Sequence, residues 1–367
     1  MLQFDYEGLS ALGLTPAIAG RAAALAVEAS DADRESPSWL GRVAEVHRET
    51  LVLQDALGQA AARVKPRLTR CLAEDGTALA VGDWVLGQDD VHGAHWVVAR
   101  VAPTNHLARV DGYGRRHPVV SNVDVALLVM GLDADFNARR LERYLALAQQ
   151  EDILPVVVLT KLDVATASAL PADERIADLR ERIGRAIEMV AVDATDASAA
   201  AALRPYLARG HTLVLLGSSG AGKSTLTNTL LGSGVQDTGP VRASDGRGMH
   251  TTTVRSLHRL PMGACIVDTP GIRALRPDGD GGALAVTFSD IDVLAAHCRF
   301  VDCRHESEPG CAVRDAVDPD RLRNWRKLAR EMARGSFTPL DRQRQLAQWK
   351  ARSKAGLARM RIKRGEA

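Results

Sequence analysis

The sequence predicts a multidomain α/β protein with an N-terminal β-barrel, a parallel-sheet domain, and a C-terminal metal-binding domain with a basic helical tail. Short β-type segments recur between Gly, Asp and Pro residues from Trp39 to about His117. After Val119, apolar segments alternate with helical ones. Three cysteines then lie within fourteen positions, ahead of a strongly basic C-terminal segment.

The composition is that of a globular protein, with 46% hydrophobic and 25% charged residues among 367. This length is sufficient for two or three domains. No apolar run reaches the roughly 18 residues of a membrane helix, and Asp5 and Glu7 stand where a signal peptide would carry Lys or Arg. Five cysteines are too few for a disulfide framework. We therefore expect a cytoplasmic protein in a reducing compartment, with no membrane association.

The charge is unevenly distributed along the chain. Residues 321–367 contain 15 Lys or Arg and 3 Asp or Glu, a net of +12. Because the whole chain carries +2, the first 320 residues carry −10. A basic end on an acidic body indicates an anionic partner, most simply nucleic acid, although a solvated helical face is the alternative.

The N-terminal half divides into an extension and a barrel. Residues 1–37 form the extension, with a helix expected over Ala17–Ala29 and a polar linker over Ser30–Ser38. No function is assigned to it. Residues 38–117 are expected to form the barrel, either an OB-fold or an SH3-like barrel. Its predicted strands are Arg42–Val46, Leu51–Leu53, Arg63–Leu68, Asp83–Leu86 and Trp96–Val101.

The parallel-sheet domain is expected over residues 118–282. Val123–Met130 and Ile153–Leu159 are continuous apolar segments separated by a helical one, Asn137–Gln150, and Leu213–Leu216 and Ala264–Val267 continue the series. Strands of this kind are covered on both faces. A Gly-rich break near residue 280 separates this domain from a metal-binding domain over 283–335 and a basic tail over 336–367.

A phosphate-binding loop follows the apolar segment that ends at Leu216. It matches G-x-x-x-x-G-K-[ST] and precedes a helix-compatible segment, Thr225–Leu231. The glycines let backbone N–H groups surround phosphate oxygens, the Lys contacts the β- and γ-phosphates, and the Ser can bind Mg²⁺. The residues expected to bind nucleotide here are Gly217, Ser218, Ser219, Gly220, Ala221, Gly222, Lys223, Ser224 and Thr225.

Two further motifs accompany this loop. Downstream, an apolar strand ends in Asp268-Thr269-Pro270-Gly271, where Asp268 can hold Mg²⁺ through water and the Gly271 N–H can meet the γ-phosphate. Upstream, Thr160-Lys161-Leu162-Asp163 follows a strand directly. A carboxylate at position 163 can accept hydrogen bonds from two N–H groups of guanine, a donor pair that adenine lacks. We therefore expect a guanine nucleotide.

Together these motifs resemble those of GTPases, except that the base-reading motif precedes the phosphate loop. This order resembles the circularly permuted GTPases, and the barrel and cysteine cluster make the chain similar to the RsgA/YjeQ family of small-ribosomal-subunit-dependent GTPases. The resemblance spans about residues 38–330 and includes Gly82-Asp83-Trp84-Val85 and Asn122-Val123-Asp124. Thr160 departs from the usual Asn, and Val192-Asp193-Ala194 is a poor match to the Ser-Ala motif that supports guanine.

The resemblance implies a circularly permuted P-loop GTPase domain between an OB-like barrel and a zinc-binding domain. It also implies GTP hydrolysis to GDP and phosphate during late maturation of the small ribosomal subunit, stimulated by the subunit and its rRNA. A monomer is expected. The alternatives are an RNA-binding sensor of GTP or ppGpp with negligible turnover, and a metabolic P-loop kinase or ATPase.

A switch loop is expected over Gly246–Thr253, between the phosphate loop and Gly271. Thr252 is the threonine expected to close on Mg²⁺. Many GTPases place a water-orienting Gln after the equivalent of Gly271, but this chain has Ile272, which cannot hydrogen-bond water. By resemblance to the family, His250 is the residue expected to position or deprotonate the attacking water. An exposed loop histidine is the alternative.

The cysteine cluster has the spacing of a zinc site. Cys298-x₄-Cys303-x-His305-x₅-Cys311 supplies four ligands of the types that Zn²⁺ prefers. A closed Cys₃His shell leaves no position for water, so one structural zinc per chain is expected. Unrelated buried cysteines are the alternative.

The segment after Arg321 is predicted to be an amphipathic helix. Trp325 and Leu328 lie on a face expected to dock on the zinc region, and the opposite face is expected to meet RNA phosphates. Its basic residues are Arg323, Arg326, Lys327, Arg330 and Arg334.

Overall fold

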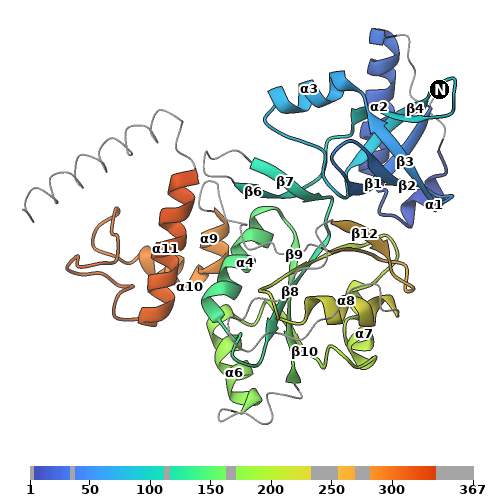
Figure 1. Ribbon diagram of the computed structural model, residues 1–367. Coiled ribbons are helices and arrows are strands. Elements are labelled where there is room, and N and C mark those ends of the chain that lie inside the picture. Colours follow the sequence, from blue (N-terminus) through green and yellow to red (C-terminus); the bar gives the residue numbers. More distant parts are fainter. Residues whose placement is uncertain are drawn as a thin grey trace, which may run out of the picture.

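The N-terminal strands form a closed barrel. The computed structural model describes residues 4–33, 38–110, 116–162, 171–232, 255–268 and 282–335. The barrel strands are β1 (Trp39–Val46), β2 (Leu51–Gln54), β3 (Gln59–Val64), β4 (Trp84–Asp89) and β5 (His95–Arg100). Their order is β1-β2-β3-β5-β4, and β4 pairs with β1 to close the circle (Figure 1). Val43, Leu53, Val85 and Val97 are buried together in this barrel.

One strand prediction was wrong in part. Arg63–Leu68 was expected to be a strand, but β3 ends at Val64 and helix α3 (Pro66–Glu74) follows. Proline fits the first turn of a helix because its missing N–H would have no partner there. The apolar side chains of Leu68 and Leu72 on this helix pack against the same buried cluster as the barrel strands.

The second half of the sheet is parallel except for one strand. It contains β8 (Val125–Gly131), β9 (Leu154–Thr160), β10 (Glu188–Ala191), β11 (Thr212–Leu216), β12 (Ser256–Arg259) and β13 (Cys265–Asp268). Their order is β10-β9-β8-β11-β13-β12, with β12 antiparallel to β13. A single pair, Glu45 with Ser256, joins this sheet to the barrel through β1 and β12.

Helices cover this sheet on both faces, as the continuous apolar segments predicted. All seven residues of β8 are buried, and the first six alternate between two separate apolar clusters. Ala126, Leu128 and Met130 belong to one cluster, and Leu127 and Val129 belong to the other. The covering elements are α4 (Ala138–Gln150), α6 (Ala172–Ile183), α7 (Ser198–Ala202), a 3₁₀ turn (Arg204–Tyr206) and α8 (Lys223–Leu231).

The N-terminal extension packs against both halves of the molecule. It contains α1 (Tyr6–Ser10) and α2 (Pro16–Asp33), so the helix predicted over Ala17–Ala29 is confirmed. Leu9, Leu12 and Ile18 are buried in the cluster that also contains barrel and sheet residues. A hairpin of β6 (His106–Val110) and β7 (Arg116–Ser121) connects the barrel strands to β8.

The fully buried side chain of Arg42 joins these parts. Its guanidinium donates to Leu12 O of the extension, to Gly82 O at 3.2 Å, to Asn122 O at 2.9 Å and to Thr212 Oγ1 at 2.8 Å. Leu12 lies before the barrel and Gly82 within it. Asn122 follows the hairpin, and Thr212 begins β11. One side chain therefore fixes the extension, the barrel and the parallel sheet relative to one another.

Three C-terminal helices lie beside α4 in Figure 1: α9 (Gly282–Thr287), α10 (Ser289–Ala295) and α11 (Pro319–Gly335). The predicted amphipathic helix is confirmed as α11, with Leu328 buried and Trp325 half-buried. Ala146 of α4 lies in the apolar cluster of these helices. The predicted basic tail, residues 336–367, lies outside the described residues.

The described helices were also considered as membrane spans. None of them combines the length and the apolar composition that crossing a bilayer requires.

Replacing Arg42 with Met should lower the free energy of unfolding by about 3 kcal/mol, because several buried acceptors lose their donor at once. The matched control is Arg209→Met, which removes one exposed hydrogen bond to Glu7 O and should cost under about 0.5 kcal/mol. Urea denaturation of the full chain measures both. Equal losses in the two variants would show that Arg42 does not hold the three parts together.

Candidate functional site

The predicted phosphate loop lies between β11 and α8, at the carboxyl edge of the sheet. Gly220 and Gly222 have φ of +82° and +90°, a backbone conformation that favours glycine. A Cβ at Gly217 would lie 2.3 Å from Val129 O, so this position admits no larger residue without a shift. The motif glycines are thus required by the shape of the loop and by its close contact with β8.

The side chain of Lys223 is held by the loop itself. Its ammonium donates to Gly217 O at 3.0 Å and to Ser218 O at 2.5 Å. Ser224 and Thr225 follow in the first turn of α8 and are half-buried. The helix therefore begins at the residue that supplies the positive charge, and its first turn is the positive end of the helix dipole, which favours an anion.

The predicted base-reading motif lies beside this loop. β9 is two strands from β11, with β8 between them, and all three strands end at the same edge. Thr160 is fully buried, and its hydroxyl donates to Ala221 O of the phosphate loop at 2.6 Å. Thr160 therefore joins the end of β9 to the phosphate loop by a hydrogen bond.

The lysine of the same motif is fixed by an aspartate. Lys161 adopts a left-handed backbone with φ of +60°, and its Nζ lies 2.6 Å from Asp133 Oδ2. Burial by itself would raise the pKa of the Asp133 carboxyl, but hydrogen bonds from Lys161 Nζ and the Asp135 N–H outweigh it and lower the pKa. Leu162 packs at the edge of the main apolar cluster.

Several predicted site residues lie outside the described residues. They are Asp163, His250, Thr252 and Gly271. Asp268 ends β13, the strand next to β11, so its backbone lies at the carboxyl edge beside the phosphate loop. The structure thus brings together the described parts of three motifs that are far apart in the sequence.

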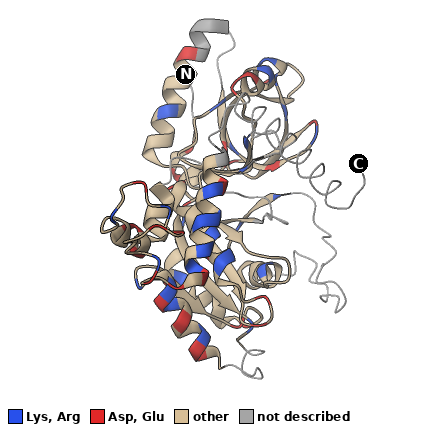
Figure 2. Cartoon of the chain, turned by 90° about the vertical axis from the view of Figure 1, so that its left-hand side faces the viewer, with Lys and Arg blue, Asp and Glu red and all other residues tan. Residues whose placement is uncertain are grey.

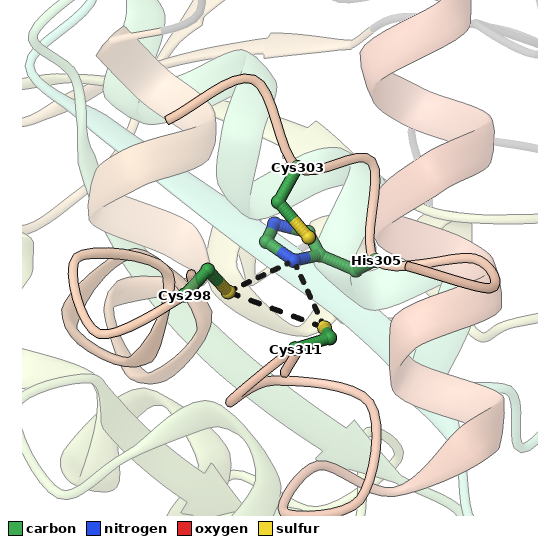
Figure 3. Close-up of side chains that lie close together, drawn as sticks. All are labelled: Cys298, Cys303, His305 and Cys311. Atoms are coloured by element: carbon green, nitrogen blue, oxygen red, sulfur yellow. Dashed lines mark hydrogen bonds between the residues drawn. The ribbon is translucent and has the colours of Figure 1, made fainter. Parts of the chain in front are cut away.

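The four predicted metal ligands form one cluster (Figure 3). One potential ligand atom from each of Cys298, Cys303, His305 and Cys311 lies within 4.8 Å of the other three. His305 Nδ1 is 3.6 Å from Cys298 Sγ and 3.5 Å from Cys311 Sγ, and those sulfurs are 4.0 Å apart. A tetrahedral zinc ion separates such atoms by roughly 3.5–3.8 Å. The residues therefore fit a metal ion of this kind.

The cluster is supported by its surroundings. His305 is buried, and the Trp325 ring of α11 lies 5.3 Å from its ring. The Glu308 carboxylate accepts hydrogen bonds from the N–H groups of Arg304, Glu306 and Ser307. Together with a hydrogen bond from the N–H of Glu308 itself, which has the largest effect, they lower the pKa of the Glu308 carboxyl to about 2. This loop is therefore folded around the ligands by groups that do not themselves bind metal.

Sequence reasoning missed two aspartates at the nucleotide site. Asp133 and Asp135 follow β8, and Asp135 accepts a hydrogen bond from the Ser218 hydroxyl of the phosphate loop. Two carboxylates directly after an apolar strand were the available signal, because the carboxyl ends of parallel strands share an edge.

It also missed the role of Arg321. This residue was counted only toward the positive charge of residues 321–367, but it is buried and lies 2.6 Å from Glu142 Oε1 and 2.7 Å from Asp290 Oδ1. Its charge therefore joins α11 to α4 and α10.

Known proteins resemble this chain along most of its length. A model of the RsgA GTPase family matches residues 101–277. The small ribosomal subunit biogenesis GTPase RsgA of Xanthomonas oryzae pv. oryzae is 45% identical over 300 residues, which cover 80% of each protein. RsgA of Xanthomonas campestris pv. campestris is 43% identical over 318 residues, covering 82% of this chain and 85% of that protein.

Two solved structures share the fold at lower sequence identity. YjeQ from Thermotoga maritima superposes with a TM-score of 0.59 at 23% identity, covering 80% of this chain and 98% of that one. YloQ, described as a circularly permuted GTPase, superposes with a TM-score of 0.55 at 22% identity, covering 82% and 96%. The permuted motif order, the strand order that reunites the motifs and the identity to these relatives agree: the chain belongs to the RsgA GTPase family.

Proposed function

We propose that this chain hydrolyses GTP to GDP and phosphate while bound to the small ribosomal subunit during its late maturation. The observation that supports this proposal is the hydrogen bond from Thr160 to Ala221, which joins the segment proposed to read the base to the phosphate loop. The relatives supply the biological setting, since they are named for biogenesis of the small ribosomal subunit. Action on that subunit places the protein in the cytoplasm, and we propose that it acts as a monomer.

The proposed roles follow the motifs. Asp163 reads the guanine edge and Lys223 binds the β- and γ-phosphates. Ser224 would hold Mg²⁺ directly and Asp268 through water. The bound Mg²⁺ would neutralise charge on the phosphates. The Gly271 N–H meets the γ-phosphate.

We assign the attacking water to His250, since Ile272 cannot orient it. A histidine within hydrogen-bond reach of that water can position it or accept its proton. Thr252 would be a further ligand of Mg²⁺ when GTP is bound.

The division into five regions is also proposed: 1–37, 38–117, 118–282, 283–335 and 336–367. The strand order β1-β2-β3-β5-β4, closed by β4 with β1, and the helix between β3 and β4 favour the OB-fold over the SH3-like alternative for the barrel. OB-folds commonly bind nucleic acid, so we assign the barrel one part of the rRNA contact.

We assign a second part of the rRNA contact to α11. Figure 2 shows that Lys and Arg positions recur along this helix, which lies on the side of the molecule nearest the viewer. Arg323, Lys327 and Arg330 are exposed, whereas Arg321 is not. Exposed cations spaced along one helix face can neutralise successive phosphates, so binding should weaken as salt rises.

We propose that the ion at the cysteine cluster is Zn²⁺ and that its role is structural. Three thiolates and one imidazole fill a tetrahedral shell, which leaves no position for a reacting water. When bound, zinc would supply folding free energy to the loop that carries its ligands.

Multiple-turnover hydrolysis should be specific for GTP and should rise when small ribosomal subunits are added. In Lys223→Ala it should fall to background, because the charge at the phosphates is lost. Release of phosphate from GTP and from ATP, each with and without subunits, measures this. Turnover that stays negligible in the presence of subunits would favour the sensor alternative, and equal use of ATP would favour the kinase or ATPase alternative.

Replacing His250 with Ala should leave GTP affinity within a few fold of the parent but lower stimulated hydrolysis by about 10²- to 10⁴-fold. The two effects separate because this residue is proposed to contact the water and not the nucleotide in the ground state. His92→Ala, an exposed histidine in the turn between β4 and β5, is the control. Unchanged stimulated turnover in His250→Ala would remove the catalytic assignment.

The parent chain should contain one equivalent of zinc, and Cys303→Ser should lose it together with stimulation by the subunit, while basal hydrolysis remains. The reason is that the cluster organises the C-terminal region and takes no part in phosphate chemistry. Cys71→Ser, an exposed free cysteine of α3, should behave like the parent. Atomic absorption and subunit co-sedimentation measure these effects. Full zinc content in Cys303→Ser would contradict the ligand assignment.

A further inference from the structure

The segment between β8 and α4 touches the phosphate loop. Within it, one carboxylate oxygen of Asp135 accepts a hydrogen bond from the Ser218 hydroxyl, and the other lies 2.6 Å from Arg140 Nη2. The Asp135 side chain is 18% exposed, so these partners replace much of its water. The carboxylate is therefore shared between the phosphate loop and the first turn of α4.

This contact completes a set that fixes the phosphate loop from outside the nucleotide pocket. Asp135 accepts a hydrogen bond from the side chain of Ser218, and Thr160 donates one to the carbonyl of Ala221. A glycine-rich loop otherwise has many conformations, and ordering it when a ligand binds costs free energy. The contacts of Asp135 and Thr160 reduce that cost before the nucleotide arrives.

The same segment leads into the helix on which the C-terminal helices dock. Asn137 caps α4 by accepting the Arg140 N–H. Within the next turn, Glu142 accepts hydrogen bonds from Arg321 and Asn324 of α11. Arg143, which pairs with Glu331 of α11, lies six positions after the N-cap Asn137, so the start of α4 and this contact are about 9 Å apart along the helix.

We propose that Asp135 is a positioning residue for the phosphate loop, and that through α4 it makes the nucleotide site sensitive to what binds α11. The first half concerns this chain and a guanine nucleotide alone. The second half rests on the proposed function, because the ligand of α11 is then the small ribosomal subunit. A stiff helix that carries contacts with both sites can transmit a small rotation at one of them to the other.

A merely structural role predicts a different pattern. If Asp135 only stabilised the start of α4 through Arg140, then Arg140→Gln would weaken nucleotide binding as much as Asp135→Ala. If Asp135 acts through Ser218, only variants that break the hydrogen bond between Asp135 and Ser218 should weaken nucleotide binding. Asp135→Asn should retain most of the affinity for nucleotide, because the amide oxygen can still accept a hydrogen bond from the Ser218 hydroxyl.

The first experiment measures binding of fluorescently labelled GDP to the full chain. Asp135→Ala and Ser218→Ala should each weaken the affinity for GDP by about tenfold. The double variant should bind no more weakly than either single variant, because both substitutions remove the same hydrogen bond. Asp135→Asn and the control Asp178→Ala, an exposed aspartate of α6, should stay within about twofold of the parent. Additive losses in the double variant, or parent-like binding by Asp135→Ala, would overturn the positioning role.

The second experiment measures hydrolysis at saturating GTP with and without small subunits. Asp135→Ala should reduce the ratio of stimulated to basal kcat by about tenfold, and Asp135→Asn should restore it. An unchanged ratio in Asp135→Ala would overturn the connection through α4. If subunits fail to stimulate the parent chain, the proposed function is wrong, and GDP binding by the double variant still decides the role of Asp135.

Discussion

The buried carboxylate of Glu142 determines how the C-terminal helices sit on the sheet domain. It is fully buried and accepts hydrogen bonds from Arg182 of α6 and from Arg321 and Asn324 of α11. A charge in this position is very unfavourable unless its partners are all in place. An apolar contact of similar size would tolerate sliding of α11 along α4. The hydrogen bonds to Glu142 can all form in only one register of the two helices. We infer that the cluster contributes more to a unique arrangement than to net stability.

This arrangement gives α4 two neighbours that are distant in sequence. Its first turn pairs through Arg140 with Asp135, which meets the phosphate loop, and Glu142 of the helix meets α11. The permuted order contributes to this, because β8 and α4 lead out of the barrel while the C-terminal helices follow β13. A nucleotide site that lies between two outer regions in the sequence is well suited to respond to a large partner that contacts both of them.

The sequence predicted the elements whose pattern is local. Continuous apolar segments marked the parallel strands, and the spacing of four ligands marked the metal cluster. The prediction failed at Pro66, because strand-like residues on either side concealed a helix start. It also missed Asp135 and Arg321, whose roles depend on partners 83 and 179 residues away. A basic helix pattern cannot show which arginine finds a buried carboxylate, since only the folded chain brings the two together.

The buried position of Arg42 has a consequence for the order in which the chain acquires its structure during synthesis. The barrel strands are complete by Arg100, but one partner of Arg42 is Thr212, more than a hundred residues later. At about 5–20 residues per second, the ribosome needs roughly 6–22 s to make that stretch. Until then, the Arg42 guanidinium lacks one of its hydrogen-bond acceptors, and β8 lacks β11 as a neighbour on one edge. The barrel can therefore form early, but it is locked to the sheet only when the strand that leads into the phosphate loop emerges.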